Sequence, residues 1–205
     1  MLLAWIAAAL AAPVTLAVIG DYGTNEPGAD TVAALVASWK PDLIATTGDN
    51  NYPDGGADTI DANIGKRYHA FIGNYTGRFG AGASENQFFP APGNHDWRAP
   101  GLEPYLAYFT LPGNERYYEV HHGLVDLFIV DSDPHEPDGI TYVVDGLGGE
   151  EAYLITRQPV EGSIVHYSKK NAALRIAIDE TAATFALVSD DGVTIDQFTV
   201  PPSAR

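Results

Sequence analysis

The chain has 205 residues, 45% hydrophobic and 19% charged, which suits a single globular domain with its own core. Its 27 acidic and 11 basic residues give a net charge of −16, which disfavours nucleic-acid and anionic-membrane partners because these require clustered lysine or arginine. The absence of cysteine excludes disulfides, thiolate metal ligands and cysteine nucleophiles.

The chain begins with an apolar run. Residues 1–12 resemble the core of a signal peptide with a small-residue end, although no basic residue precedes the core. Pro13 interrupts the run, so we expect no stable membrane span. We predict a signal peptide over residues 1–12, one domain over 13–205 and a secreted or periplasmic location. The alternatives are a ragged N-terminal helix or a misplaced start site.

Strands and helices alternate along the first two-thirds of the chain. Apolar, β-branched runs predict strands, and apolar residues at helical spacing predict helices. The segments expected in order are strand 14–21, helix 28–39, strand 42–49, helix 57–72, short strand 88–96 and buried strand 124–131. This alternation is typical of a layered α/β domain.

The C-terminal third has a different pattern, with short strands and no helix between them. We expect strands at 140–145, 173–179, 184–190 and 193–200, with a hairpin turn at Asp190-Asp-Gly192. The predicted architecture is a mixed sheet with helices outside it, together with a second, mostly antiparallel sheet from the C-terminal half.

Three of the predicted strands run into polar residues in the same way. The sequences at these points are Gly20-Asp21, Gly48-Asp49 and Gly93-Asn-His-Asp96. Ligands of open α/β sheets lie beyond the carboxyl ends of the strands, so we expect these side chains to share one edge. Glycine before each of them permits a sharp turn and close approach to an ion. Hard oxygen donors of this kind suit Mg, Mn, Fe or Zn.

These motifs resemble a known family. Gly20-Asp-Tyr-Gly23, Gly48-Asp-Asn-Asn-Tyr52 and Gly93-Asn-His-Asp96 are similar to the first three motifs of the purple acid phosphatases, which are calcineurin-like metallophosphoesterases. The similarity extends over nearly the whole chain. It implies an α/β/β/α sandwich that hydrolyses phosphate monoesters, either small molecules or phosphoproteins, at a dinuclear centre of iron with iron, zinc or manganese.

The resemblance also assigns roles to individual residues. Asp21 would bind the first metal, Asp49 would bridge both metals, and Tyr52 would be a phenolate ligand of a ferric first metal. Asn94 would bind the second metal, and His95 would contact the phosphate or protonate the leaving group. The alternatives are that both aspartates form turns or cap helices and that Tyr52 is an ordinary half-buried tyrosine.

Two later motifs of the family, Val-x-x-His and Gly-His-x-His, are missing, and with them three imidazole ligands. In relatives both motifs lie between the stretches that here meet near 138–139, which indicates an internal excision and an incomplete sandwich. We expect at most one tightly bound metal. The alternative function is a secreted, non-catalytic remnant that binds a cation or a partner. His135 could replace a lost imidazole or be solvated, whereas Asp131 and Asp133 are expected to order a loop. The remaining histidines are expected on the surface or on a strand face: His69, His121, His122 and His166.

Overall fold

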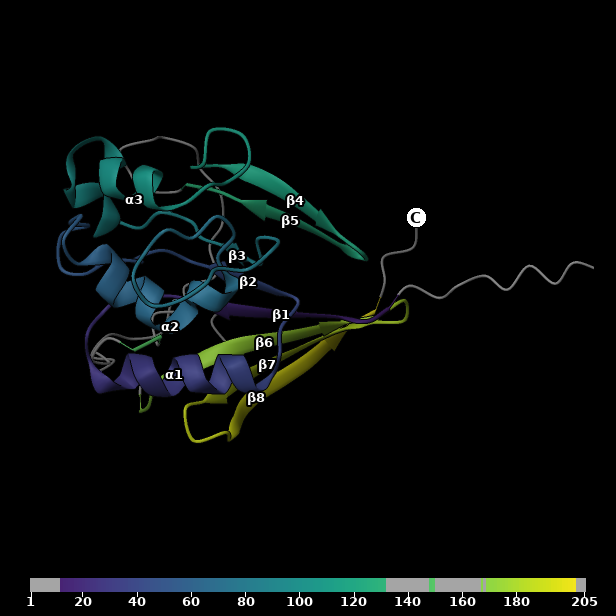
Figure 1. The fold of residues 1–205 in the computed structure, drawn as a ribbon. Helices are drawn as coiled ribbons and strands as arrows, with labels where there is room; N and C mark the ends of the chain where they lie inside the picture. The colour runs from purple at the N-terminus through teal and green to yellow at the C-terminus, as the bar shows by residue number, and fades with distance from the viewer. Residues whose placement is uncertain (1–11, 132–147, 150–166, 168, 202–205) are drawn as a thin grey trace, which may run out of the picture.

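The computed structural model describes residues 12–131, 148–149, 167 and 169–201, drawn in colour in Figure 1. The main sheet has the strand order β3-β2-β1-β6-β7-β8, and β4 pairs with β5 in a separate two-stranded sheet. The strands are β1 (Val14–Ile19), β2 (Leu43–Thr46), β3 (Phe88–Phe89), β4 (Tyr118–His122), β5 (Val125–Ile129), β6 (Ala172–Ile178), β7 (Ala183–Ser189) and β8 (Thr194–Val200).

The centre of the main sheet is parallel and buried. β1 pairs with β2, and β2 pairs with β3, all in the same direction. Every residue of β2 is buried, as are Ala17 and Ile19 of β1, which explains the continuous apolar runs in the sequence. The carboxyl ends of these strands therefore lie at one edge of the sheet, where the sequence places its polar motifs.

Helix α1 (Pro27–Ser38) packs beside β6 on the main sheet (Figure 1). Pro27 occupies the first turn, where its missing N–H costs no hydrogen bond. Val32 and Val36 are fully buried one turn apart, as the apolar spacing predicts. The helix expected at residues 28–39 is therefore confirmed within a residue at each end.

The second expected helix, at residues 57–72, is only partly an α-helix. A π-helical turn at Asp61–Gly65 leads into α2 (Lys66–Tyr68), and a 3₁₀ turn at His69–Phe71 follows. The Oδ1 atom of Asp61 accepts hydrogen bonds from the hydroxyls of Tyr75 and Tyr108, at 2.6 and 2.9 Å. These partners lie outside the helix, so local spacing could not predict the irregular turn.

The C-terminal strands extend the main sheet. β6 pairs antiparallel with β1, and β7 and β8 follow it in antiparallel order. The α/β class, the mixed sheet and the antiparallel C-terminal strands are thus confirmed. The expected second sheet is not made by these strands, because β6 takes the place beside β1. Gly192 forms the predicted hairpin turn with a φ of 82° and donates its N–H to the carbonyl of Ser189.

The strand expected at residues 124–131 forms, but one of its faces is exposed. β5 pairs with β4 in a hairpin that lies with α3 (Glu103–Tyr108) on the β3 side of the main sheet (Figure 1). Phe128 is 66% exposed and Ile129 is buried, so the side chains alternate between solvent and core. The prediction of a buried strand was wrong for this face, because a mostly apolar run does not distinguish a hairpin strand from a central one.

Several expectations lie outside the described residues: the signal-peptide segment, the junction near 138–139, the strand at 140–145, and the surroundings of Asp133, His135 and His166. In the part of the chain that the structure describes, no helix is both long and apolar enough to cross a membrane.

A buried guanidinium connects α2 to the start of α1. The side chain of Arg67 is 2% exposed, and its Nε lies 2.8 Å from Oδ1 of Asp30. Its Nη1 donates to the carbonyls of Thr24 and Asn63, at 2.6 and 3.1 Å. One side chain therefore satisfies acceptors from three segments of the chain.

We expect Arg67→Met to lower the free energy of unfolding by about 2–4 kcal/mol, because it leaves buried carbonyls without a donor. Urea denaturation of both proteins measures the difference. Arg78→Met is the matched control: its side chain is 70% exposed and lies 3.7 Å from Asp61, so its effect should stay within about 0.5 kcal/mol. Equal losses in the two variants would contradict the structural role of Arg67.

Candidate functional site

Three loops meet at the carboxyl edge of the parallel strands. Asp21 follows β1, Asp49 follows β2, and the segment 93–96 follows β3. Asp21 and Asp49 have φ angles of 53° and 52°, in the left-handed region that residues other than glycine rarely adopt. Strained backbone of this kind is common at functional sites, because the surrounding structure must hold it in place.

The hydroxyl of Tyr52 brings the two aspartates together. Its Oη atom lies 2.6 Å from Oδ1 of Asp21 and 3.0 Å from Oδ2 of Asp49. Burial raises the pKa of Tyr52 well above its usual value, and the hydrogen bond and negative charge of Asp21 raise it further, followed by those of Asp49. Two carboxylates and a phenol from separate motifs therefore converge on one point.

The third motif contacts Asp49 through its backbone. The N–H of His95 donates to Oδ1 of Asp49 at 2.9 Å, so both carboxylate oxygens of Asp49 are oriented. A Cβ atom on Gly93 would lie 2.1 Å from the nitrogen of Asp49, which only a glycine can avoid. The loops after β2 and β3 are thus in direct backbone contact.

The ring of His95 lies over Tyr52, with the ring centroids 4.2 Å apart. Its Nδ1 is 2.6 Å from the carbonyl oxygen of Pro53. A carbonyl can only accept, so Nδ1 carries the proton and Nε2 is the nitrogen left for a ligand. Asn94 precedes His95 in the same loop and is exposed. The structure therefore brings together four of the residues predicted from sequence, Asp21, Asp49, Tyr52 and His95, with Asn94 next to His95 in the chain.

Sequence reasoning missed two residues whose hydrogen bonds hold the loops of the site together. Asn50 is fully buried and donates from its backbone N–H and from Nδ2 to Oδ2 of Asp96, at 3.0 and 2.8 Å. The N–H of Gly93 donates to the same oxygen at 2.8 Å. Oδ1 of Asn50 accepts from the hydroxyls of Tyr22 and Thr46. Both residues lie within the motifs, but the sequence analysis assigned them no role, and the only signal was that they are polar.

The donor set fits one hard cation. The carboxylates of Asp21 and Asp49 both lie against the Tyr52 hydroxyl, and a cation at that point would offset their mutual repulsion and favour the phenolate. Within the described ranges, no three histidine or acidic side chains are arranged to hold an ion, so Tyr52 is needed to complete the set.

Other candidates from the sequence lie in different surroundings. Nδ1 of His69 is 2.9 Å from the carbonyl of Gly65, and His121 pairs with Asp126 on the exposed face of the hairpin. Oδ2 of Asp131 lies 3.1 Å from Nε of Arg116, and its Oδ1 accepts from the indole of Trp97. Asp131 therefore holds Arg116 and Trp97 in place, while the loop that it was expected to order lies outside the described residues.

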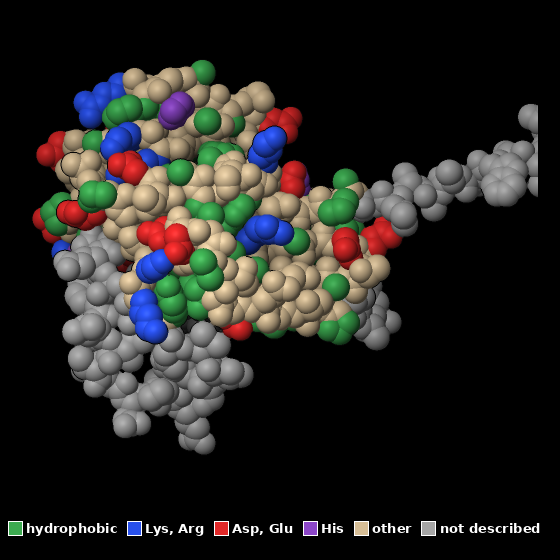
Figure 2. All heavy atoms as spheres, turned by 90° about the horizontal axis from the view of Figure 1, so that it is seen from below, with side chains coloured by type: hydrophobic (Ala, Val, Ile, Leu, Met, Phe, Trp, Pro, Cys, Tyr) green, Lys and Arg blue, Asp and Glu red, His purple; other side chains and the backbone are tan. Residues whose placement is uncertain are grey.

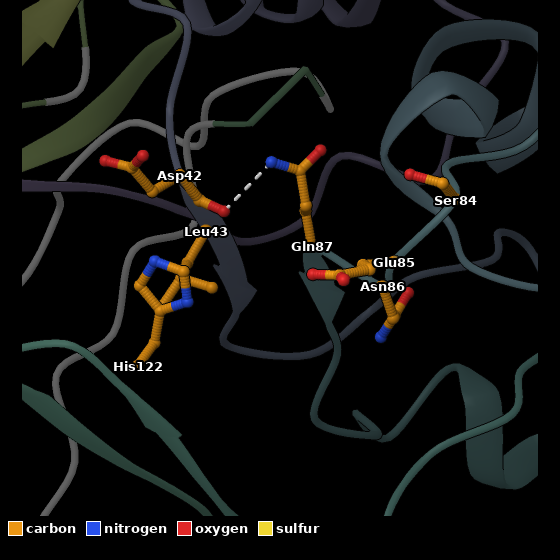
Figure 3. Close-up of a pocket in the computed structure, with 7 residues that line it drawn as sticks. All are labelled: Asp42, Leu43, Ser84, Glu85, Asn86, Gln87 and His122. Atoms are coloured by element: carbon orange, nitrogen blue, oxygen red, sulfur yellow. Dashed lines mark hydrogen bonds between the residues drawn. The ribbon is translucent and has the colours of Figure 1, made fainter.

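A polar cavity of about 220 Å³ lies at the opposite end of β2, where Asp42 and Leu43 begin the strand (Figure 3). Nε2 of Gln87 donates to the carbonyl of Asp42 across it, and Asn86 bonds to the backbone of Gly73 and Phe88. These bonds close off much of its polar lining. The cavity is separate from the edge that carries the motifs and adds no residue to the site.

The fold and the site together define a phosphoesterase-type α/β protein. The family described as calcineurin-like phosphoesterase matches residues 14–173, and the chain belongs to this family. Its members generally bind divalent metal and hydrolyse phosphoesters. No curated protein is detectably similar in sequence.

Solved structures match this chain at low sequence identity, one of them with a TM-score that shows a shared fold. GAP50, described as the anchor in the inner membrane complex of Plasmodium, is 11% identical with a TM-score of 0.64, over 94% of this chain and 90% of that one. A phosphoesterase-like protein of Streptococcus pneumoniae is 12% identical, with a TM-score of 0.42 over 92% and 99% of the two chains. The E. coli phosphoesterase YfcE is 16% identical, with a TM-score of 0.47 over 90% and 98%.

Asp96 gives the supporting network a pH dependence. Burial raises the pKa of Asp96 to about 6 from its usual 3.8, although hydrogen bonds from Asn50 and Gly93 oppose the shift. The folded state thus holds this proton more tightly than the unfolded state. The resulting stabilisation is complete below pH 3.8 and is lost as the pH rises through 6, which amounts to about 3 kcal/mol.

The native protein loses stability as the pH rises from 4 to 7, whereas the amide of Asp96→Asn does not titrate. We therefore expect the free energy of unfolding of the variant, minus that of the native protein, to be about 3 kcal/mol higher at pH 7 than at pH 4. Urea denaturation with a chelator present, at several pH values, measures this difference. Asp58→Asn, at an exposed position, should show no such trend. A pH-independent difference for Asp96→Asn would show that Asp96 is ionised throughout this range.

Proposed function

We propose that this chain is a metal-dependent phosphate monoesterase of the purple acid phosphatase type, working outside the cytoplasm with one tightly held metal ion. The observation that carries the proposal is the contact of the Tyr52 hydroxyl with both Asp21 and Asp49. A tyrosine between two carboxylates at the edge of parallel strands is the arrangement that the family motifs imply. Family membership supports phosphoester hydrolysis as the reaction.

Each residue has a distinct task in this proposal. Asp21, Asp49 and Tyr52 hold the ion, which when bound neutralises phosphate charge and activates water. Asn94 offers its carboxamide to the phosphate or to a second, weakly held ion. His95, fixed through Nδ1, presents Nε2 to the phosphate and donates from it to the leaving-group oxygen when protonated. The hydrogen bonds between Asn50 and Asp96 hold the two loops in their relative positions.

The substrates in this proposal are small phosphate esters or phosphoproteins. Basic side chains on the face shown in Figure 2 are scattered and often lie beside acidic ones, which supports the exclusion of nucleic acid. The segment 1–12 supports export, and an excision near 138–139 accounts for the missing histidine motifs.

A second candidate function is binding of a cation or a partner without turnover. The observation that favours it is chemical: the described residues assemble only oxygen donors, and the sequence has neither Val-x-x-His nor Gly-His-x-His. Without nitrogen ligands the second ion of a two-metal mechanism is lost, and with it much of the transition-state stabilisation. The anchor described for GAP50 is consistent with a non-catalytic use of this fold.

Hydrolysis of phenyl phosphate with iron, zinc, manganese or magnesium distinguishes the two functions. We expect slow, metal-dependent turnover that falls at least about 100-fold in Asp49→Asn, because that variant removes the negative charge and one of the two acceptor oxygens of Asp49, whose carboxylate accepts from both His95 and Tyr52. Asp58→Asn, at an exposed position in the next loop, should retain activity. Metal binding without any turnover would favour the second candidate.

A spectroscopic experiment tests the role of Tyr52 directly. If Tyr52 binds ferric iron as a phenolate, loading with iron should produce a visible charge-transfer band, and Tyr52→Phe should abolish it. The exchange removes one oxygen, so we expect the variant to bind iron at least about tenfold more weakly. Tyr117→Phe is a suitable control, because Tyr117 is exposed and lies just before β4. An unchanged band in Tyr52→Phe would contradict the assignment.

A further inference from the structure

Arg98 connects the two loops that carry the site. Its Nη1 atom donates to the carbonyl oxygen of Pro53 at 3.0 Å and lies 3.3 Å from Oδ1 of Asp54. The same Pro53 oxygen accepts the hydrogen bond from Nδ1 of His95. The guanidinium and the imidazole therefore converge on a single atom, which sets a permanent positive charge beside the histidine assigned to the phosphate.

The guanidinium of Arg98 is only partly engaged. The side chains of Arg98 and Asp54 are 47% and 68% exposed, and an exposed ion pair contributes little because water competes with it. Within the described ranges, Nη1 makes all of its hydrogen bonds, so Nε and Nη2 are open to a ligand. A planar group with two open donors suits bidentate binding of a carboxylate or a phosphate.

Other arginines of the described chain are engaged differently. Arg67 is buried against Asp30 and backbone carbonyls. The guanidinium of Arg116 lies 4.7 Å from the centre of the Trp97 ring and pairs with the buried Asp131. Arg98 combines partial exposure, a position three residues after His95 and a bond to the loop that follows Tyr52.

We propose that Arg98 is a specificity-determining residue that selects phosphate esters whose leaving group carries a second anionic group, either a carboxylate or a further phosphate. The inference rests on the proposed function, because it requires the reacting phosphate to lie beside His95. The substrate anion replaces Asp54, which returns to water, so no charge is left unpaired. In a chain of net charge −16, this cation also offsets the repulsion of a multiply charged substrate.

The test uses two phosphonates that cannot be hydrolysed and differ only in one carboxylate: phenylphosphonate and 4-carboxyphenylphosphonate. Calorimetric titration of the manganese-loaded full chain at fixed ionic strength measures both dissociation constants. We expect the native protein to bind the carboxylated compound about tenfold more tightly. Arg98→Gln should bring this ratio close to one, and Arg98→Lys should retain part of it. Arg78→Gln, on an exposed arginine elsewhere, should leave the ratio unchanged.

Two results would overturn the proposal: a ratio near one for the native protein, or a ratio that survives in Arg98→Gln. A surviving ratio with both phosphonates bound more weakly to the same extent would assign Arg98 a structural role in joining the loops. Hydrolysis of phenyl phosphate, measured in parallel, distinguishes failure of the proposed function from failure of the proposed role of Arg98. An Arg98-dependent ratio without turnover would contradict the phosphatase function but support the anion selectivity of Arg98. Turnover without such a ratio would support the phosphatase function and contradict the role of Arg98.

Discussion

The carboxylate of Asp96 accepts hydrogen bonds from two loops that follow different strands. One of its oxygens is bonded to the backbone and side chain of Asn50 and to the backbone of Gly93. These bonds are buried, and Asn50 passes them on to Tyr22 and Thr46 in the core. A buried carboxylate that lost these donors would be strongly destabilising, so the loops are held against each other as a unit. The positions of Asp49 and His95 depend on this contact.

The site above this contact concentrates negative charge in a chain that is already acidic. Asp21 and Asp49 share one phenol proton, and the pKa of that phenol is raised by its burial and by the two carboxylates. Two carboxylates and a phenol at one point are donors that suit a cation, which would offset the repulsion between the carboxylates. Arg98 adds a permanent positive charge at the side, bound to the same carbonyl as His95. Metal and arginine together would give an anionic substrate a favourable place on an otherwise repulsive surface.

The fold explains the position of the site residues at one edge of the main sheet. The parallel strands β1, β2 and β3 carry the aligned motifs, and the antiparallel strands β6 to β8 extend the same sheet on the other side of β1. The oxygen donors come from the loops that follow the parallel strands β1, β2 and β3, and not from the antiparallel strands. Under the proposed purple acid phosphatase type, the absence of Val-x-x-His and Gly-His-x-His from the sequence would decide between slow catalysis and binding without turnover.

The sequence by itself determined the parallel strands, the first helix, the C-terminal hairpin and the convergence of Asp21, Asp49, Tyr52 and His95, because each depends on local periodicity or on residues that directly follow a strand. Tertiary structure alone decided the place of β6 beside β1, the exposed face of β5 and the π-helical turn at Asp61. It also decided that Asn50 and Asp96 form one buried network and that Arg98 and His95 share the Pro53 carbonyl. The physical reason is that these features depend on atoms that are distant in the chain, and no local pattern records which distant groups will meet when the core closes.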